Sequence, residues 1–155
     1  MNLSKHFTLE EFTKSQTGDR LGINNDPDPK YLESLKMLCN DVLEVVRENL
    51  GPVHINSGFR GVALNKAMGG ASSSQHCRGQ AADIEIPGVA NGDLAKWIEK
   101  NCDYDQLILE CYKTGVPTSG WVHVSYLPFP PGNRKQYLTS TMSNGRMTYQ
   151  EGFHL

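Results

Sequence analysis

Apolar residues in the first third of the chain recur with the spacing of amphipathic helices. Thr8 and Glu11 are the residue types of a capping box, which predicts a short helix that starts after Thr8. The Asp28-Pro29 pair predicts the start of a longer helix, and Gly51-Pro52 predicts its end. We expect this longer helix to pack its apolar face in the core, through Leu32, Leu35, Leu38, Val42 and Val46.

The rest of the chain alternates like short strands joined by turns rich in glycine and proline. Strands are predicted over residues 53–57, 81–86, 106–111 and 121–126. Helices are expected around residues 64–68 and over residues 92–100, the second one capped by Asn91, and a hairpin is expected at Asn144-Gly145. This mixture predicts an α+β fold: a small, mainly antiparallel sheet with helices packed on one side.

Length and composition fit one globular domain over residues 1–155. The chain is 38% hydrophobic and 21% charged, which lies on the polar side of the globular range. It has no apolar run of about 18 residues, so we expect no membrane span. A net charge of −2 argues against a general nucleic-acid binder, because such proteins usually carry a basic excess. We also expect a monomer.

The cysteines and the first residues bear on the cellular compartment. The four cysteines are scattered without a C-x-x-C pair, and residues 1–7 contain no apolar stretch typical of a signal peptide. We therefore expect reduced thiols and synthesis in the cytoplasm without a signal peptide.

The segment from Ser74 to Asp83 holds the most informative chemistry. His76 and Asp83 can meet if Gly79 turns the chain into a strand that passes beneath the imidazole. An imidazole and a carboxylate without a thiolate suit a catalytic rather than a structural Zn²⁺. A third ligand is needed, and His123 is the candidate, since strand alternation puts it on the face opposite two core valines.

Together these residues resemble the zinc D-Ala-D-Ala peptidases of the M15 type. The family signature S-x-H-x-x-G-x-A-x-D is matched at every fixed position, by Ser74, His76, Gly79, Ala81 and Asp83. A W-V-H-V strand is matched by residues 121–124 and an S-G-F-R element by residues 57–60. The resemblance covers about residues 5–126. It implies the hedgehog/DD-peptidase fold, with His76, Asp83 and His123 as Zn²⁺ ligands and water in the open fourth position.

The general base is the point at which this chain departs from the family pattern. Many members carry a Glu three residues before the last His, where this chain has Gly120. We predict Glu110 instead, because a hairpin centred near residue 116 sets residue 110 opposite 122 or 123. Glu85 is the alternative, one pleat further from the metal on the strand of Asp83.

Four more residues are predicted to contact substrate. Arg60 can hold a carboxylate or a peptide carbonyl with paired donors, and in the family this Arg also lies near the developing oxyanion. Ser74 is expected to hydrogen-bond the substrate or to support Asp83. Gln75 and Gln106 are expected to line the site.

The resemblance implies a peptidoglycan peptidase that cleaves a stem-peptide bond, as a D-Ala-type carboxypeptidase or an endopeptidase. A chain of this size without a signal peptide suggests a phage or prophage endolysin that reaches the cell wall after holin-type release. The alternatives are a non-catalytic zinc domain that binds the cell wall and a virion structural protein. Residues 127–155 lie outside the resemblance and either add a hairpin to the sheet edge or contact the wall through Arg134, Lys135 and Arg146.

Overall fold

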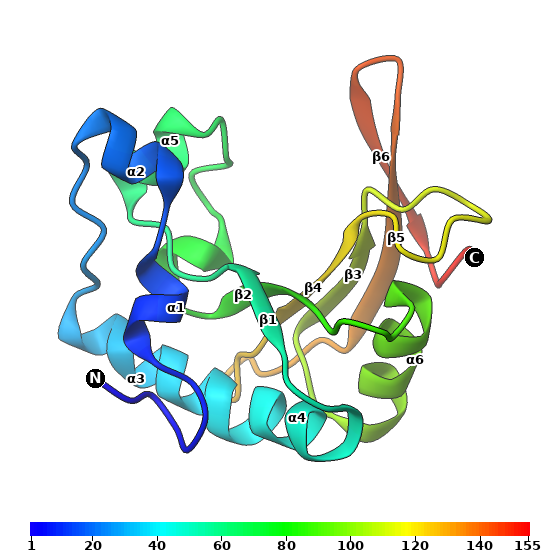
Figure 1. Ribbon diagram of the computed structural model, residues 1–155, viewed down its shortest axis with the longest axis horizontal. Coiled ribbons are helices and arrows are strands. Elements are labelled where there is room, and N and C mark those ends of the chain that lie inside the picture. The colour runs from blue at the N-terminus through cyan, green and yellow to red at the C-terminus, as the bar shows by residue number, and fades with distance from the viewer.

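The computed structural model describes all 155 residues and is built on one six-stranded sheet (Figure 1). The strand order is β1-β2-β4-β3-β5-β6, and all neighbours are antiparallel except β3 and β5. The strands are β1 (His54–Ser57), β2 (Ala81–Glu85), β3 (Gln106–Glu110), β4 (Trp121–Ser125), β5 (Gln136–Ser143) and β6 (Arg146–Glu151). The predicted α+β class with a mainly antiparallel sheet is confirmed.

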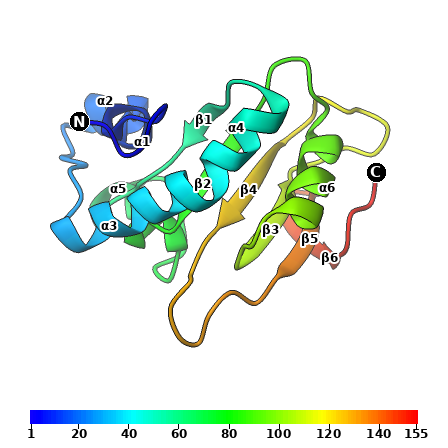
Figure 2. The same cartoon turned by 90° about the horizontal axis from the view of Figure 1, so that it is seen from below.

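The larger helices cover one face of this sheet, as Figure 2 shows. They are α3 (Pro29–Leu38), α4 (Glu44–Leu50) and α6 (Asn91–Asn101). The predicted long helix is confirmed, but a five-residue π-helical segment, Cys39–Leu43, joins α3 to α4. Leu35, Val42 and Val46 are fully buried, as the apolar spacing predicted.

Shorter helices lie beside the β1 edge and frame one end of the sheet (Figure 1). They are α1 (Leu9–Thr13), α2 (Gln16–Leu21), α5 (Val62–Ala67) and the 3₁₀ turn η2 (Gln75–Arg78). The capping box at the start of α1 is confirmed, since Thr8 and Glu11 each accept a hydrogen bond from the other's backbone N–H. None of the helices combines the length and the apolar character needed to cross a lipid bilayer.

Strand alternation separates a core face from a polar face. Val122 and Val124 are fully buried against the helices, as predicted for β4. His123 lies between them in the chain and therefore points to the opposite face. Asp83 is the partner of His123 across β2 and β4, so both polar side chains lie on the face away from the helices.

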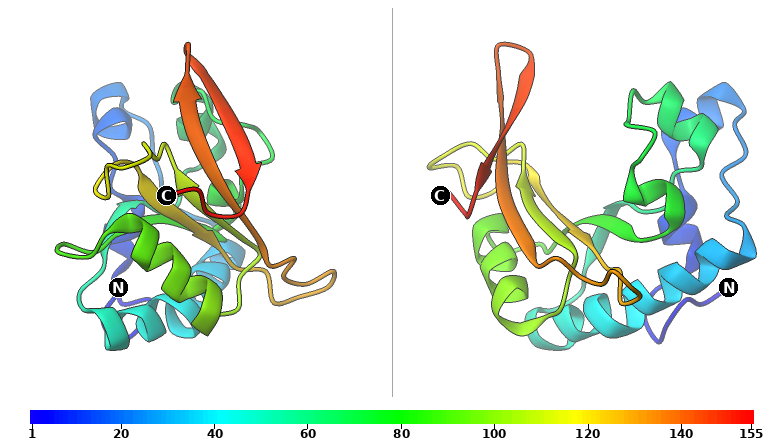
Figure 3. Two further views of the ribbon diagram at one scale, coloured as in Figure 1. Left: turned by 90° about the vertical axis from the view of Figure 1, so that its right-hand side faces the viewer. Right: turned by 180° about the vertical axis from the view of Figure 1, so that it is seen from behind.

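The last two strands extend the sheet beyond β3. Strand β5 pairs in parallel with β3, and the Asn144-Gly145 turn leads into β6, which confirms the predicted hairpin. Figure 3 shows this hairpin rising past the rest of the sheet. Residues 136–151 thus form part of the sheet itself.

The predicted cap of α6 is wrong by one residue. Ala90 is the N-cap, and Asn91 is already helical. The Asn91 side chain instead donates hydrogen bonds to Glu85 and to the carbonyl groups of Ser119 and Gly120. Its amide therefore links α6 to β2 and to the start of β4.

Gly79 ends the turn that carries His76, in a conformation that glycine adopts readily. Its φ is +68°, and an added Cβ would lie 2.5 Å from the backbone oxygen of Tyr31. We expect Gly79→Ala to lower the free energy of unfolding by about 1–2 kcal/mol because of the left-handed backbone, and by about 1–3 kcal/mol more because of the clash. Denaturant unfolding would measure the sum of the two losses.

Gly22 provides the matched control. Its φ is +67°, but an added Cβ would meet nothing within 4 Å. Gly22→Ala should therefore show the backbone cost alone. Equal losses in the two variants would contradict the close approach to Tyr31.

Candidate metal centre

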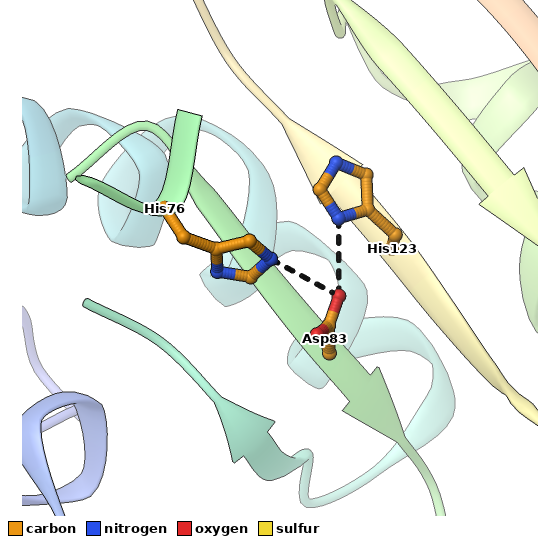
Figure 4. Close-up of side chains that lie close together, drawn as sticks. All are labelled: His76, Asp83 and His123. Atoms are coloured by element: carbon orange, nitrogen blue, oxygen red, sulfur yellow. Dashed lines mark hydrogen bonds and ion pairs between the residues drawn. The ribbon is translucent and has the colours of Figure 1, made fainter. Parts of the chain in front are cut away.

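Three buried polar side chains converge on the polar face of the sheet. Figure 4 shows His76 from η2, Asp83 from β2 and His123 from β4 pointing toward one another. Their ligand atoms all lie within 4.8 Å of one another. Asp83 Oδ1 lies 3.0 Å from His123 Nδ1 and 3.4 Å from His76 Nε2. The structure thus brings the three predicted metal ligands together.

The hydrogen bonds of His76 show why this cluster suits a cation. His76 Nδ1 lies 2.7 Å from the carbonyl oxygen of Gly58, so Nδ1 carries the proton that is donated. In a neutral ring, Nε2 then carries no proton, and its lone pair faces the Asp83 carboxylate. Two acceptors in this position repel each other unless a proton or a metal ion lies between them.

The charge on Asp83 supports the same conclusion. Burial raises the pKa of this carboxyl, but the charges and hydrogen bonds of His76 and His123 outweigh burial and hold the pKa well below its usual range. The ionised carboxylate and two imidazoles form an N₂O donor set without a thiolate, which is typical of catalytic zinc sites. Cys77 lies next to His76 in sequence but does not belong to the cluster.

The cluster lines an open cavity of about 710 Å³. The other predicted site residues, Arg60, Ser74, Gln75, Gln106 and Glu110, line the same cavity. Glu85 does not. Its carboxylate binds Asn56 and Asn91 beside a different pocket, so it is separated from the cluster.

Glu110 reaches this cavity through a register that differs by one or two residues from the prediction, which set it opposite residue 122 or 123. It pairs with Trp121, and Ile108 pairs with His123, because the hairpin is centred between residues 115 and 116. All four side chains share the polar face of the sheet. Burial raises the pKa of the Glu110 carboxyl. The charges of His123 and Arg60 lower this pKa, and the charge of Asp83 raises it further, so that the net shift is upward.

A family model described as peptidase M15 matches residues 5–125, which is most of the chain. The chain belongs to the peptidase M15 family. This confirms the resemblance seen in the signatures around His76 and His123. The zinc D-Ala-D-Ala carboxypeptidase of Streptomyces albus G is 46% identical over 44 residues, or 27% of this chain. The aligned segment spans 17% of that relative's length.

Gly120 occupies the position where many M15 members carry a Glu, and the structure explains the difference. Its φ is +66°, and an added Cβ would lie 1.8 Å from the backbone oxygen of Glu110. Cys111, across the hairpin, also has a positive φ, of 51°. This end of the β3–β4 hairpin therefore excludes any side chain at position 120.

Arg60 and Ser74 hold the turn of His76 in place. The backbone N–H of Arg60 donates to the carbonyl of His76, and Ser74 Oγ accepts from the backbone N–H of His76. Ser74 thus supports His76 directly, whereas the sequence suggested support of Asp83. Arg60 Nε and Trp121 Nε1 are buried donors without a partner, and both residues line the cavity.

Asp105 is the site residue that sequence reasoning missed. Its buried carboxylate accepts from Gln75 Nε2 and, at 3.0 Å each, from the backbone N, Nε and Nη2 of Arg134. It therefore joins the His76 turn to the segment before β5. In the sequence, Asp105 begins a D-Q-L-I element that resembles the family's strand before the last ligand, but this resemblance gives no information about a partner 29 residues away.

The Asp105 hydrogen bonds predict a pH-dependent stability. Burial raises the pKa of Asp105, but hydrogen bonds from Arg134 and Gln75 outweigh it and lower the pKa. The unfolded chain therefore binds more protons, and this stabilisation is lost as the pH falls below about 4 through the folded-state pKa. Asp105→Asn should cost about 1–3 kcal/mol at pH 7. Because protonated Asp105 resembles Asn, the difference from wild type should shrink toward pH 3.

Urea unfolding of metal-free protein at several pH values would measure this difference. Asp26→Asn is the control, since Asp26 is exposed and its carboxylate forms no hydrogen bond or ion pair with the protein. A difference for Asp105→Asn that stays constant with pH would contradict the role of the charged carboxylate.

Proposed function

We propose that this M15 protein is a zinc-dependent peptidase that hydrolyses a bond in the stem peptide of peptidoglycan. The observation that carries the proposal is the buried His76, Asp83 and His123 cluster at an open cavity. The name of the Streptomyces albus G relative, a zinc D-Ala-D-Ala carboxypeptidase, supports both the metal and the substrate class.

The same three residues would hold the zinc ion. The fit rests on the N₂O donor set and on the His76 lone pair, which faces a carboxylate and needs a positive charge beside it. Bound zinc would supply Lewis-acid chemistry, acidifying water and polarising the scissile carbonyl. The three side chains come from a rigid sheet and a capped turn, which favours a fixed ligand geometry.

Glu110 is the proposed general base. Its carboxylate would take a proton from the attacking water and pass it to the leaving amine. Support comes from its place in the cavity, on the strand paired with that of His123. Its raised pKa also suits a group that must both accept and release a proton near neutral pH.

Arg60 is proposed to bind the peptide at the reacting end of the cavity. Arg60 lines the same cavity as Glu110, and its charge opposes the rise in the pKa of that carboxyl. Its buried Nε has no protein partner and offers a donor to a peptide carbonyl or carboxylate. Ser74, Gln75 and Gln106 would line the path of the peptide.

The type of peptidase and its biological role are proposed from the sequence resemblance. We propose a D-Ala-type carboxypeptidase or endopeptidase that serves as a phage or prophage endolysin. Release of free D-alanine from purified peptidoglycan would identify the carboxypeptidase, whereas release of larger peptide fragments would identify the endopeptidase.

Replacing Glu110 tests the proposed base. Glu110→Gln should lower the rate of peptidoglycan hydrolysis by about 10²–10⁴-fold, the range for loss of a general base. Zinc content should not change, because Glu110 is not among the three ligands. Glu85→Gln, at a different pocket, should retain activity. Wild-type rates in Glu110→Gln would exclude Glu110 as the base.

Acidification and replacement of the metal ligand His76 test whether hydrolysis depends on bound zinc. The imidazoles must be neutral to bind zinc, so acid should release the metal. Zinc retained after dialysis at each pH should fall in step with hydrolysis, and His76→Ala should lose both at pH 7. Hydrolysis that persists in a chelator would contradict the proposal. Full zinc occupancy without hydrolysis would favour the non-catalytic binding domain.

A further inference from the structure

The second wall of the cavity comes from the chain beyond the family match. The match ends at residue 125, yet several later residues line the cavity beside the metal cluster. They are Leu127, Pro131, Gly132, Arg134, Gln136, Leu138 and Tyr149. This wall is therefore a feature that the M15 signatures do not describe.

Arg134 is the charged residue of this wall, and its guanidinium is fixed in place. Nε and Nη2 bind the two oxygens of Asp105 at 3.0 Å each, and the backbone N–H of Arg134 binds the same carboxylate. Asp105 in turn is held by Gln75. A guanidinium anchored in this way loses little conformational freedom when it binds a ligand.

The Arg134 guanidinium has further N–H donors that form no hydrogen bond within the protein. Of its five N–H groups, Asp105 takes one on Nε and one on Nη2. The others have no protein partner, and the side chain is 58% exposed at the cavity. Free guanidinium donors in a peptide-sized cavity match a carboxylate.

Strand β3 gives the position of Arg134 relative to the metal cluster. Ile108 is paired with His123, and Gln106, two residues earlier on the same face, is paired with Gln136 and bonded to its side chain. Arg134 binds Asp105, which lies just before Gln106 and three residues before Ile108. Three strand residues span about 10 Å, which is also the length of about three residues of an extended peptide.

We propose that Arg134 binds a carboxylate of the substrate about three residues from the scissile bond. This rests on the proposed peptidase function and specifies its substrate as a peptide with a second acidic group. Arg60 would act from the β1 side of the metal cluster and Arg134 from the β5 side. The second wall would therefore select peptides by charge at a distance from the reacting atoms.

The test compares matched peptides. Each peptide of a panel carries one free carboxylate at a successive position on either side of the scissile bond, and each has a twin in which that carboxylate is an amide. The wild type should prefer the acid by about 10- to 100-fold in kcat/KM, the range for hydrogen bonds to a charged group. The preference should peak about three residues from the bond and lie mainly in KM.

Arg134→Gln should remove the preference without changing zinc content. Lys135→Gln removes the same charge from the neighbouring residue, whose side chain is 59% exposed with one long ion pair, and should keep the preference. Arg134→Lys keeps the charge but not the paired donors, so it should show an intermediate preference. Thermal unfolding would verify that each variant is folded, and Arg134→Lys carries the test if Arg134→Gln is not.

Two results would overturn the inference: a wild type that does not distinguish acid from amide, or an undiminished preference in the folded Arg134 variants. If the wild type cleaves no peptide, the proposed function fails separately. Calorimetric binding of the acid and amide peptides to zinc-loaded wild type and Arg134→Gln then decides the role of Arg134 by the same comparison.

Discussion

Two imidazole nitrogens and one carboxylate oxygen share a buried space in which a positive charge must accompany them. The register of β2 against β4 sets Asp83 opposite His123, so two of the three are fixed by backbone hydrogen bonds. His76 comes from outside the sheet and needs more support: Gly58, Ser74 and the backbone of Arg60 each bind it. The helices on the other face keep the strands in register by burying their apolar side chains.

The sequence predicted the features that rest on local patterns. The capping box at Thr8, the turn at Asn144-Gly145 and the alternation of residues 121–125 each depend on neighbours in the chain, and each was confirmed. The family signature identified residues that the fold does bring together. The hydrogen bonds of side chains at the ends of elements were harder to predict. Asn91 matches the residue type of a helix cap, but its amide instead joins α6 to β2 and to the segment before β4.

What could not be predicted depends on pairs far apart in sequence. The predicted register of β3 against β4 was off by one or two residues, because the ten-residue connection hides where the turn is centred. The bond of Asp105 to Arg134 joins a strand start to an irregular segment that no periodic pattern describes. The relation between Gly120 and Glu110 is also long-range. The absence of a side chain just before β4 and the carboxylate at the end of β3 can be interpreted only once the two strands are paired.

The parallel pairing of β5 with β3 has a consequence for local opening of the sheet. The three residues of the metal cluster come from η2, β2 and β4, whereas β5 pairs only with β3 and β6. The β5–β6 hairpin can therefore detach from the edge of β3 without changing the register of β2 against β4. Such an opening removes the wall with Arg134 and Tyr149 but leaves the metal cluster assembled. Assembly of the cluster and closure of the cavity are thus separable properties of this sheet.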